Sequence, residues 1–462
     1  MAMEQAGAVK APPREGLLAA LAVGALTVAL CLLAPLRPQG GDTLPGRLGA
    51  VTLACRQSLD LREVEWLRAR VAQPPMPYYV HWAPDGALRS TFGPAPALLG
   101  MPAMVSLTPT MIVGDRALVR RARYASSGAL GVSATLLCVA LLAATAWRRA
   151  ALLALVAACS FAGAATLGQG LWQQTAALPF LLGALASVAW SQDRKVLTPL
   201  AATLATLAVW CRPPLLPLAG GLCLAAAMPR RREPRGWAWV SGAIALGLAT
   251  AALLGWWKLR WTGEALPLGQ AAANLRSLGG DVWGLHPWRS PGALLGLLVS
   301  PGRGLLVYAP VAILAMVLAA RSRDERARCV LVGILGQVLL TVGFRLWWGG
   351  ATFGPRLLAE LVWVAPWLLA LAPESPGIRR LEGLTLAVTV AVGLLGLWRF
   401  DPRSWELQAP SSAYPARLWQ VTDSPLPALF RPLPAERLRD APQGPFQYCG
   451  RAALADLGPA PR

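Results

Sequence analysis

A small set of polar side chains suited to catalysis lies in short segments between long apolar runs. Asp42 stands in the segment Gly-Gly-Asp-Thr-Leu-Pro-Gly-Arg (40–47), directly after the first apolar run. A carboxylate held just above the end of a membrane-spanning helix can act as a general base or as a metal ligand near a lipid head group. The alternative is an ordinary solvated acid in a loop.

Three arginines at the ends of apolar runs suit the phosphate of a lipid. Arg303 stands in Ser-Pro-Gly-Arg-Gly, Arg356 follows Trp-Trp-Gly-Gly, and Arg212 stands in Trp-Cys-Arg-Pro-Pro. A guanidinium binds phosphate through two parallel hydrogen bonds, and neighbouring glycines let a ligand approach the backbone. The alternative is that these arginines only extend toward lipid head groups. Because each stands at the end of a run, we expect it to lie outside the packed core.

Glu360 is the only acid within a predicted span, and it lies four residues after Arg356. An acid inside a membrane usually has a function and a partner, so we expect these two side chains to pair on one helix face. The pair can alternatively serve helix packing alone. Trp172, Gln173 and Gln174 follow another apolar run, and an indole beside amides can bind a sugar by stacking and hydrogen bonding. The alternative is anchoring at the membrane interface.

The elements that position these residues are predicted to be membrane-spanning helices. Hydrophobic residues make up 55% of the 462-residue chain and charged residues 14%, roughly half the share usual in soluble domains. This composition excludes a soluble globular, disordered, collagen-like or small disulfide-rich protein. The sequence predicts an all-α bundle of about eleven spans. The apolar runs are 16–36, 125–146, 150–168, 175–190, 197–211, 214–228, 238–257, 304–320, 329–344, 357–372 and 383–397.

The basic turns between these runs predict the orientation of the chain. With the N-terminus in the cytoplasm, every even-numbered turn is basic and cytoplasmic, as the positive-inside rule requires. These turns contain Arg148–Arg149, Arg194–Lys195, Arg230–Arg232, Arg321–Arg328 and Arg379–Arg380. The plan predicts a transmembrane domain over 1–399 and a Pro-rich extracytoplasmic tail over 400–462. The outer loops are 37–124, 258–303 and 345–356.

Three further segments are predicted to lie at the outer membrane surface without crossing. A crossing by the Pro-rich run 92–113 would turn every later basic loop outward, so an interfacial or re-entrant helix is expected there, and likewise over 292–299. The charged segment 59–68 is predicted to form a short amphipathic interfacial helix.

The net charge of +20 comes almost entirely from arginine. In a membrane protein this balance indicates basic cytoplasmic loops and contacts with anionic lipids, and no nucleic-acid-binding motif accompanies it. Two histidines do not favour a His-ligated metal site. Six cysteines lie in or beside apolar runs, whereas Cys55 and Cys449 lie in polar outer segments and can pair as a disulfide in an oxidising compartment.

The order of the motifs resembles bacterial membrane proteins of the GT-C glycosyltransferase superfamily, which includes protein O-mannosyltransferases and aminoarabinose lipid transferases. The resemblance extends over about residues 16–372. It is carried by Gly-Asp-x-x-Pro-x-Arg, Pro-Tyr-Tyr, Trp-Gln-Gln, Cys-Arg-Pro, Ser-Pro-Gly-Arg-Gly-Leu and Trp-Trp-Gly-Gly-x-x-x-Gly-Pro-Arg.

This resemblance implies a multi-pass protein of the bacterial cytoplasmic membrane with its active site on the outer face. The donor would be a polyprenyl-phosphate sugar, the acceptor a lipid or cell-envelope molecule, and the transfer inverting. Asp42 matches the superfamily's first-loop base by position. Arg303, Arg356 and Arg212 become candidates for the donor phosphate by placement, and Glu360 for substrate binding with the Trp-Gln-Gln segment.

Two departures qualify the resemblance. The subgroup usually has Trp-Gln-His where this chain has Trp172-Gln173-Gln174, which puts an acid–base role at position 174 in doubt. Many members carry a second acid in the first loop, whereas Thr43 follows Asp42 here. This favours metal-independent chemistry, although a divalent cation remains possible. The rival functions are a transporter or flippase of lipid-linked sugars and a non-catalytic membrane scaffold.

Overall fold

The structure is a computed structural model of the chain. It describes residues 14–36, 41–64, 67–68, 71–72, 77, 79–106, 112–113, 115–233, 235–262, 290–344, 346–350, 352–373, 375–401, 405, 415–430 and 446–447.

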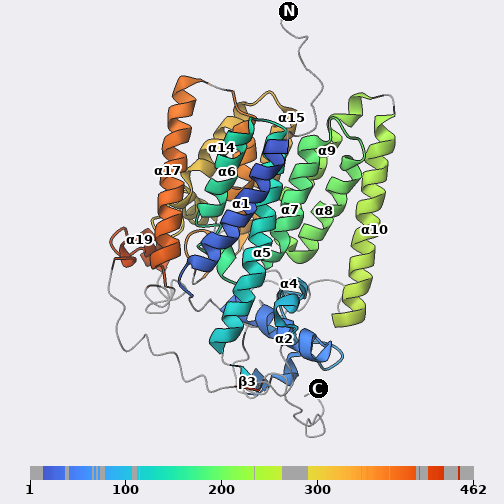
Figure 1. Ribbon diagram of the computed structural model, residues 1–462, viewed down its shortest axis with the longest axis vertical. Helices are drawn as coiled ribbons and strands as arrows, with labels where there is room; N and C mark the ends of the chain where they lie inside the picture. The colour runs from blue at the N-terminus through green and yellow to red at the C-terminus, as the bar shows by residue number, and fades with distance from the viewer. Residues whose placement is uncertain are drawn as a thin grey trace, which may run out of the picture.

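Each of the eleven apolar runs contains a helix, and together these helices form a bundle (Figure 1). Five of them, α1, α5, α10, α15 and α17, are long and apolar enough to cross a membrane, as expected of a multi-pass integral membrane protein. Eleven crossings stay a prediction because the other six helices are shorter or less apolar. The helices are α1 (Arg14–Leu33), α5 (Asp115–Leu142), α6 (Trp147–Cys159), α7 (Gln173–Trp190), α8 (Leu197–Cys211), α9 (Leu216–Ala227), α10 (Gly236–Thr262), α14 (Pro310–Arg321), α15 (Glu325–Gly343), α16 (Ala359–Ala370) and α17 (Pro376–Arg399).

The basic turns lie together at one end of the bundle, the upper end in Figure 1. Ion pairs join them: Arg149 binds Glu382 at 3.0 Å, and Arg231 binds Glu325 at 3.0 Å. The first loop after α1 lies at the opposite end. The structure therefore separates the two groups of turns that the sequence assigns to opposite sides.

The first loop contains more irregular structure than the all-α prediction allowed. It begins with α2 (Leu44–Arg56) and continues through an antiparallel hairpin of β1 (Val80–Trp82) and β2 (Leu88–Ser90). The helix predicted over 59–68 is present only in part: a 3₁₀ turn forms at Leu61–Glu63, Val64 is extended, and Leu67 and Arg68 are helical. The side chain of Asp60 accepts hydrogen bonds from the N–H groups of Arg62 and Leu88, which ties the start of this segment to β2.

The two remaining surface segments form short helices. In the Pro-rich run, α4 (Ala95–Gly100) passes into a 3₁₀ turn at Met101–Met104, and the second segment forms α12 (Ser290–Val299). Both are shorter than the roughly 20 residues needed to cross a bilayer. The tail also packs at this end. Strand β4 (Phe446–Gln447) pairs with β3 (Ile112–Val113), and Trp405 and Leu418 pack against Trp348.

Candidate functional site

Asp42 and Arg356 meet at the end of the bundle opposite the basic turns. Asp42 lies in a 3₁₀ turn, Gly41–Thr43, that leads into α2, and Arg356 begins a 3₁₀ turn that leads into α16. Nη2 of Arg356 donates hydrogen bonds to Oδ2 of Asp42 and, at 3.0 Å, to the carbonyl oxygen of Gly349. The sequence placed both residues at outer span ends, and the structure brings them into contact.

The ring of Trp172 packs against the guanidinium of Arg356. The centre of the guanidinium lies 4.3 Å from the centroid of the indole, which is cation–π geometry. The indole N–H donates to the carbonyl oxygen of Thr166 at 3.0 Å, which fixes the orientation of the ring. Trp172 is buried, and the arginine covers the face that sugar stacking would need. Gln174, also a predicted sugar ligand, is buried in the first turn of α7.

Glu360 pairs with Arg212, so the predicted direct pair between Arg356 and Glu360 is wrong. The spacing misleads because α16 begins at Ala359, and Arg356 lies in the 3₁₀ turn before it. Arg212 binds Glu360 and donates to the carbonyl oxygen of Leu357 at 3.1 Å. The two side chains are 3% and 0% exposed, so this ion pair is sealed inside the protein. It joins the end of α8 to the turn that carries Arg356.

Arg303 is fully buried, which contradicts the expectation that it lies outside the packed core. Its guanidinium donates to the carbonyl oxygens of Trp348 at 2.8 Å, Gly302 at 2.8 Å and Gly350 at 2.7 Å. The ring of Trp405 stacks on it at 5.0 Å. These contacts tie three backbone segments together.

One glycine turn serves both of these arginines. Gly349 presents its carbonyl oxygen to Arg356, and Gly350 presents its own to Arg303. Both glycines have positive φ, 80° and 71°, a conformation that residues with a side chain rarely adopt. The Trp-Trp-Gly-Gly motif is therefore explained locally as the turn that fixes two guanidinium groups.

Close packing of α2 fixes the start of the helix that follows Asp42. A Cβ atom on Gly46 would lie 2.8 Å from Cβ of Pro96 in α4 and 3.1 Å from the carbonyl oxygen of Leu171. Since real Cβ atoms do not approach so closely, only glycine lets α2 lie against both neighbours. Gly46 is four residues from Asp42, so this contact sets the position of the acid.

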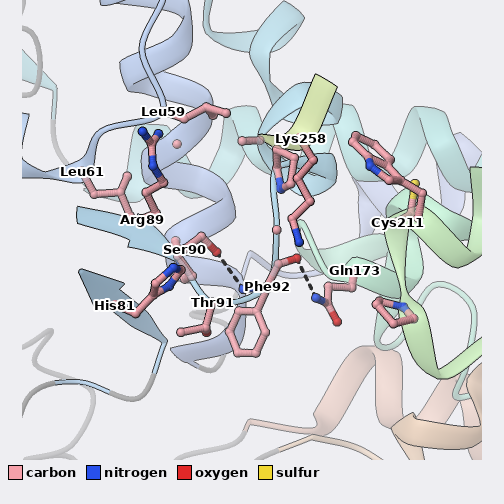
Figure 2. A pocket seen from close by; sticks show the side chains of 17 residues that line it. Leu59, Leu61, His81, Arg89, Ser90, Thr91, Phe92, Gln173, Cys211 and Lys258 are labelled. Atoms are coloured by element: carbon pink, nitrogen blue, oxygen red, sulfur yellow. Dashed lines mark hydrogen bonds between the residues drawn. The ribbon is translucent and has the colours of Figure 1, made fainter. Parts of the chain in front are cut away.

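A pocket of about 50 Å³ is lined in part by Pro45 and Gly49 of α2 and by Gln173, the residue after Trp172 (Figure 2). Gln173, the predicted residue after Trp172, lines it and donates to the carbonyl oxygen of Phe92 at 2.6 Å. His81 and Arg89 reach the pocket from the β1–β2 hairpin, and Lys258 reaches it from α10.

These three basic residues were not predicted. For His81 and Arg89 the signal was Asp85-Gly86 between two short runs, a sequence typical of a tight hairpin turn. Asp85 binds Arg89. Burial opposes ionisation of Asp85, but hydrogen bonds from the Ala87 N–H and from Arg89 outweigh it and hold the pKa of this carboxyl below its usual value.

Two other predictions concern metals and cysteines. Within the described ranges, no three His, Cys, Asp or Glu side chains come together as metal ligands. Cys55 is disulfide-bonded, and its predicted partner Cys449 lies outside the described residues. The six cysteines in or beside the apolar runs are free.

Comparisons with known proteins identify no family for this chain. No family model matches it, and no curated protein matches it. Among solved structures it is similar to the archaeal oligosaccharyltransferase AglB from Archaeoglobus fulgidus in complex with an inhibitory peptide and a dolichol-phosphate. The TM-score is 0.41 at 11% identity, covering 90% of this chain and 61% of that one.

Two further structures of the Archaeoglobus fulgidus oligosaccharyltransferase give similar values. The apo form has a TM-score of 0.40 at 12% identity, covering 91% of this chain and 62% of that one. The form tethered with an acceptor peptide has a TM-score of 0.42 at 12% identity, covering 91% and 61%. This chain therefore spans less than two thirds of the length of those proteins. A likeness this distant carries no conclusion about function.

Proposed function

We propose that this protein is a membrane glycosyltransferase that moves a sugar from a polyprenyl-phosphate donor to an acceptor hydroxyl. The reaction would take place on the outer face of the bacterial cytoplasmic membrane. The observation that carries the proposal is the contact between Asp42 and Arg356. It places a carboxylate and a guanidinium, 314 residues apart in sequence, at one mouth of a membrane bundle beside a pocket.

Asp42 is the general base of the proposed reaction. The acceptor oxygen attacks the anomeric carbon of the donor sugar and gives its proton to the Asp42 carboxylate. The bond between the anomeric carbon and the phosphate oxygen breaks, and its electron pair stays on the phosphate. A single displacement of this kind inverts the anomeric configuration. The side chain of Asp42 is 24% exposed, so an acceptor can reach it.

Arg356 is the proposed partner of the leaving phosphate. Its guanidinium donates a hydrogen bond to Oδ2 of Asp42. The incoming phosphate competes with this carboxylate for the N–H donors of Arg356. When the phosphate takes the Nη2 donor, Oδ2 of Asp42 is released from Arg356 and accepts the acceptor proton. The positive charge then stabilises the negative charge that develops on the phosphate as the bond breaks.

Arg212, Glu360 and Arg303 are proposed to position this site and not to bind the donor. Arg212 and Glu360 fix the turn that carries Arg356 through a sealed ion pair and the Leu357 carbonyl. Arg303 fixes the glycine turn that holds Arg356 from the other side. Gln173 is the proposed polar contact for substrate, since it lines the pocket.

The test is turnover by the full-length protein in liposomes, with a panel of polyprenyl-phosphate hexoses and bacterial lipid extract as the source of acceptor. Free polyprenyl phosphate and new glycolipid are both measured. Asp42→Asn keeps the shape of the side chain but cannot take the proton, so turnover is expected to fall by about 10²-fold or more. Asp193→Asn is the matched control, because Asp193 is an exposed acid in a basic turn at the opposite end.

Two results would overturn the proposal. The first is wild-type turnover by the Asp42→Asn protein, which would remove the base. The second is transfer of intact lipid-linked sugar from one leaflet to the other without release of polyprenyl phosphate, which is the behaviour of a flippase.

A further inference from the structure

The β1–β2 hairpin presents a polar face to the pocket beside the Asp42 site. His81 lies opposite Arg89 in the antiparallel register, so their side chains are on the same face. Thr91 follows Arg89 by two residues and therefore shares that face. All three line the pocket and are 5%, 9% and 5% exposed. The pocket lining does not include Asp42, Arg356 or Trp172.

On this face, Nε of Arg89 and Oγ1 of Thr91 are buried without a hydrogen-bond partner among the described residues. Buried polar groups are nearly always hydrogen-bonded, since leaving one unsatisfied is costly. The N–H and the hydroxyl can both donate to an anion in the pocket. The pocket therefore carries donors that the fold itself does not use.

The other wall of the pocket comes from the membrane-spanning helices. Trp210 and Cys211 end α8, and Lys258 lies in the last turns of α10. The ring of Trp210 contacts that of Trp257 with centroids 5.5 Å apart, which is typical of the half-wet interface of a membrane. Only 6% of the apolar window of α10 is buried, so this helix faces lipid along most of its length.

The ligand that fits both walls is an anionic lipid. Lys258 extends from α10 toward Phe92 and Gln173 (Figure 2). The apolar lining includes Leu59, Leu61 and Phe92, which suit acyl chains. A soluble anion would need no apolar wall, and a neutral lipid would leave the donors of Arg89 and Thr91 unsatisfied.

We propose that this pocket binds the phosphate of the acceptor, which is then a phosphate-bearing lipid of the outer leaflet. This inference rests on the proposed function in one respect, the naming of the bound lipid as the acceptor. The pocket is assigned to the acceptor because the donor phosphate is already assigned to Arg356. Nε of Arg89 and Oγ1 of Thr91 donate to the lipid phosphate. Lys258 adds positive charge where the head group leaves the bilayer.

The test measures lipid binding, and it needs no turnover. Full-length protein in detergent is titrated with phosphatidylglycerol, phosphatidylcholine, polyprenyl phosphate and inorganic phosphate, and bound lipid is counted by native mass spectrometry. We expect phosphatidylglycerol to bind at least tenfold more tightly than phosphatidylcholine. Lys258→Gln and Thr91→Val should each reduce this preference. Arg260→Gln is the matched control, since Arg260 is an exposed basic residue on the same helix outside the pocket.

Asp42→Asn separates this inference from the proposed function. An inactive Asp42→Asn protein that still binds phosphatidylglycerol supports both the proposed function and the lipid site. An active Asp42→Asn protein contradicts the role of Asp42 as the base but does not affect the lipid site. If Lys258→Gln and Arg260→Gln reduced the preference for phosphatidylglycerol equally, the pocket would not be the binding site. Preference for polyprenyl phosphate at this site would overturn the acceptor assignment, and equally tight binding of inorganic phosphate would overturn the lipid.

Discussion

The guanidinium of Arg356 donates a hydrogen bond to the carboxylate of Asp42, and of the two side chains the acid is the more exposed, at 24% against 8%. Arg356 is held by protein on its other sides, with Trp172 beneath it and the Gly349 carbonyl beside it. The acid is therefore the member of the pair that the proposed acceptor would meet. The arginine is placed beforehand, so little reorganisation is needed when charge develops next to it.

Substitution of Arg356 should separate charge from geometry. Arg356→Ala removes the charge that we propose stabilises the leaving phosphate, and we expect turnover to fall by about 10²-fold. Arg356→Lys should recover part of this loss, since an ammonium keeps the charge but cannot donate to the carboxylate and the Gly349 carbonyl in the fork geometry of arginine. The measurements are kcat and KM for the donor in liposomes.

Arg399→Ala is the control for Arg356, because Arg399 is an exposed arginine at the C-terminal end of α17. Arg356→Lys activity equal to wild type would show that the fork geometry has no role. Equal loss in Arg356→Ala and Arg399→Ala would show that the effect is one of general surface charge.

Arg303→Ala is expected to reduce the stability of the protein more than its specific activity. The substitution removes three hydrogen bonds to backbone carbonyls that are otherwise bound by a buried guanidinium. Each carbonyl left unsatisfied costs about 1–3 kcal/mol. We expect a lower yield in the membrane and a lower melting temperature in detergent. Specific activity per folded molecule should change less than in Arg356→Ala, and a stable but inactive Arg303→Ala protein would instead support donor binding.

The pair of Arg212 and Glu360 should behave as a coupled unit. Glu360→Ala leaves the guanidinium of Arg212 buried without its counter-charge, and breaking a sealed pair in this way costs about 3–5 kcal/mol. The double variant Arg212→Met with Glu360→Leu removes both charges and should be more stable than Glu360→Ala alone. Thermal unfolding of purified protein checks this ranking. Strictly additive losses would show that the two residues are not energetically coupled.

The disulfide of Cys55 predicts a definite thiol count. Six of the eight cysteines are free, so denatured, unreduced protein should be alkylated at six positions and reduced protein at eight. Cys55 lies in the last turns of α2, the helix that follows Asp42, so its reduction should also lower the melting temperature. Cys449→Ser should abolish the difference between the two counts if Cys449 is the partner, and an unchanged difference between them would identify a different partner.

The local features of the bundle were predictable, because apolar runs and basic turns are properties of short stretches of sequence. Each run contains a helix, and the basic turns gather at one end. The partners of the charged residues were not predictable in the same way. Arg356 binds an acid 314 residues away and Glu360 an arginine 148 residues away, although their own spacing suggested a pair. Which charged residues pair depends on how helices that are distant in sequence pack together. The periodicity of the sequence carries no information about this packing.

The hairpin was missed for a different reason. Its strands have three residues each, too short for alternation of polar and apolar residues to stand out. The Asp85-Gly86 turn was the usable signal. With the turn recognised, the register places His81 opposite Arg89 and shows the polar face of the pocket before any helix is packed.

The side of the membrane on which Asp42 lies depends on the orientation of the chain. The structure joins the basic turns at one end and places Asp42 at the other, so one compartment assignment decides both. The positive-inside rule predicts that the basic end is cytoplasmic. Alkaline phosphatase fused after Arg399 or after Arg462 should therefore be active, because this enzyme folds only in an oxidising compartment. Alkaline phosphatase fused within the turns at Lys195 or Arg380 should be inactive. A fluorescent protein that folds in the cytoplasm should be fluorescent at the same two positions. The reverse pattern would place Asp42 and its pocket in the cytoplasm, and the outer-face reaction would have to be abandoned.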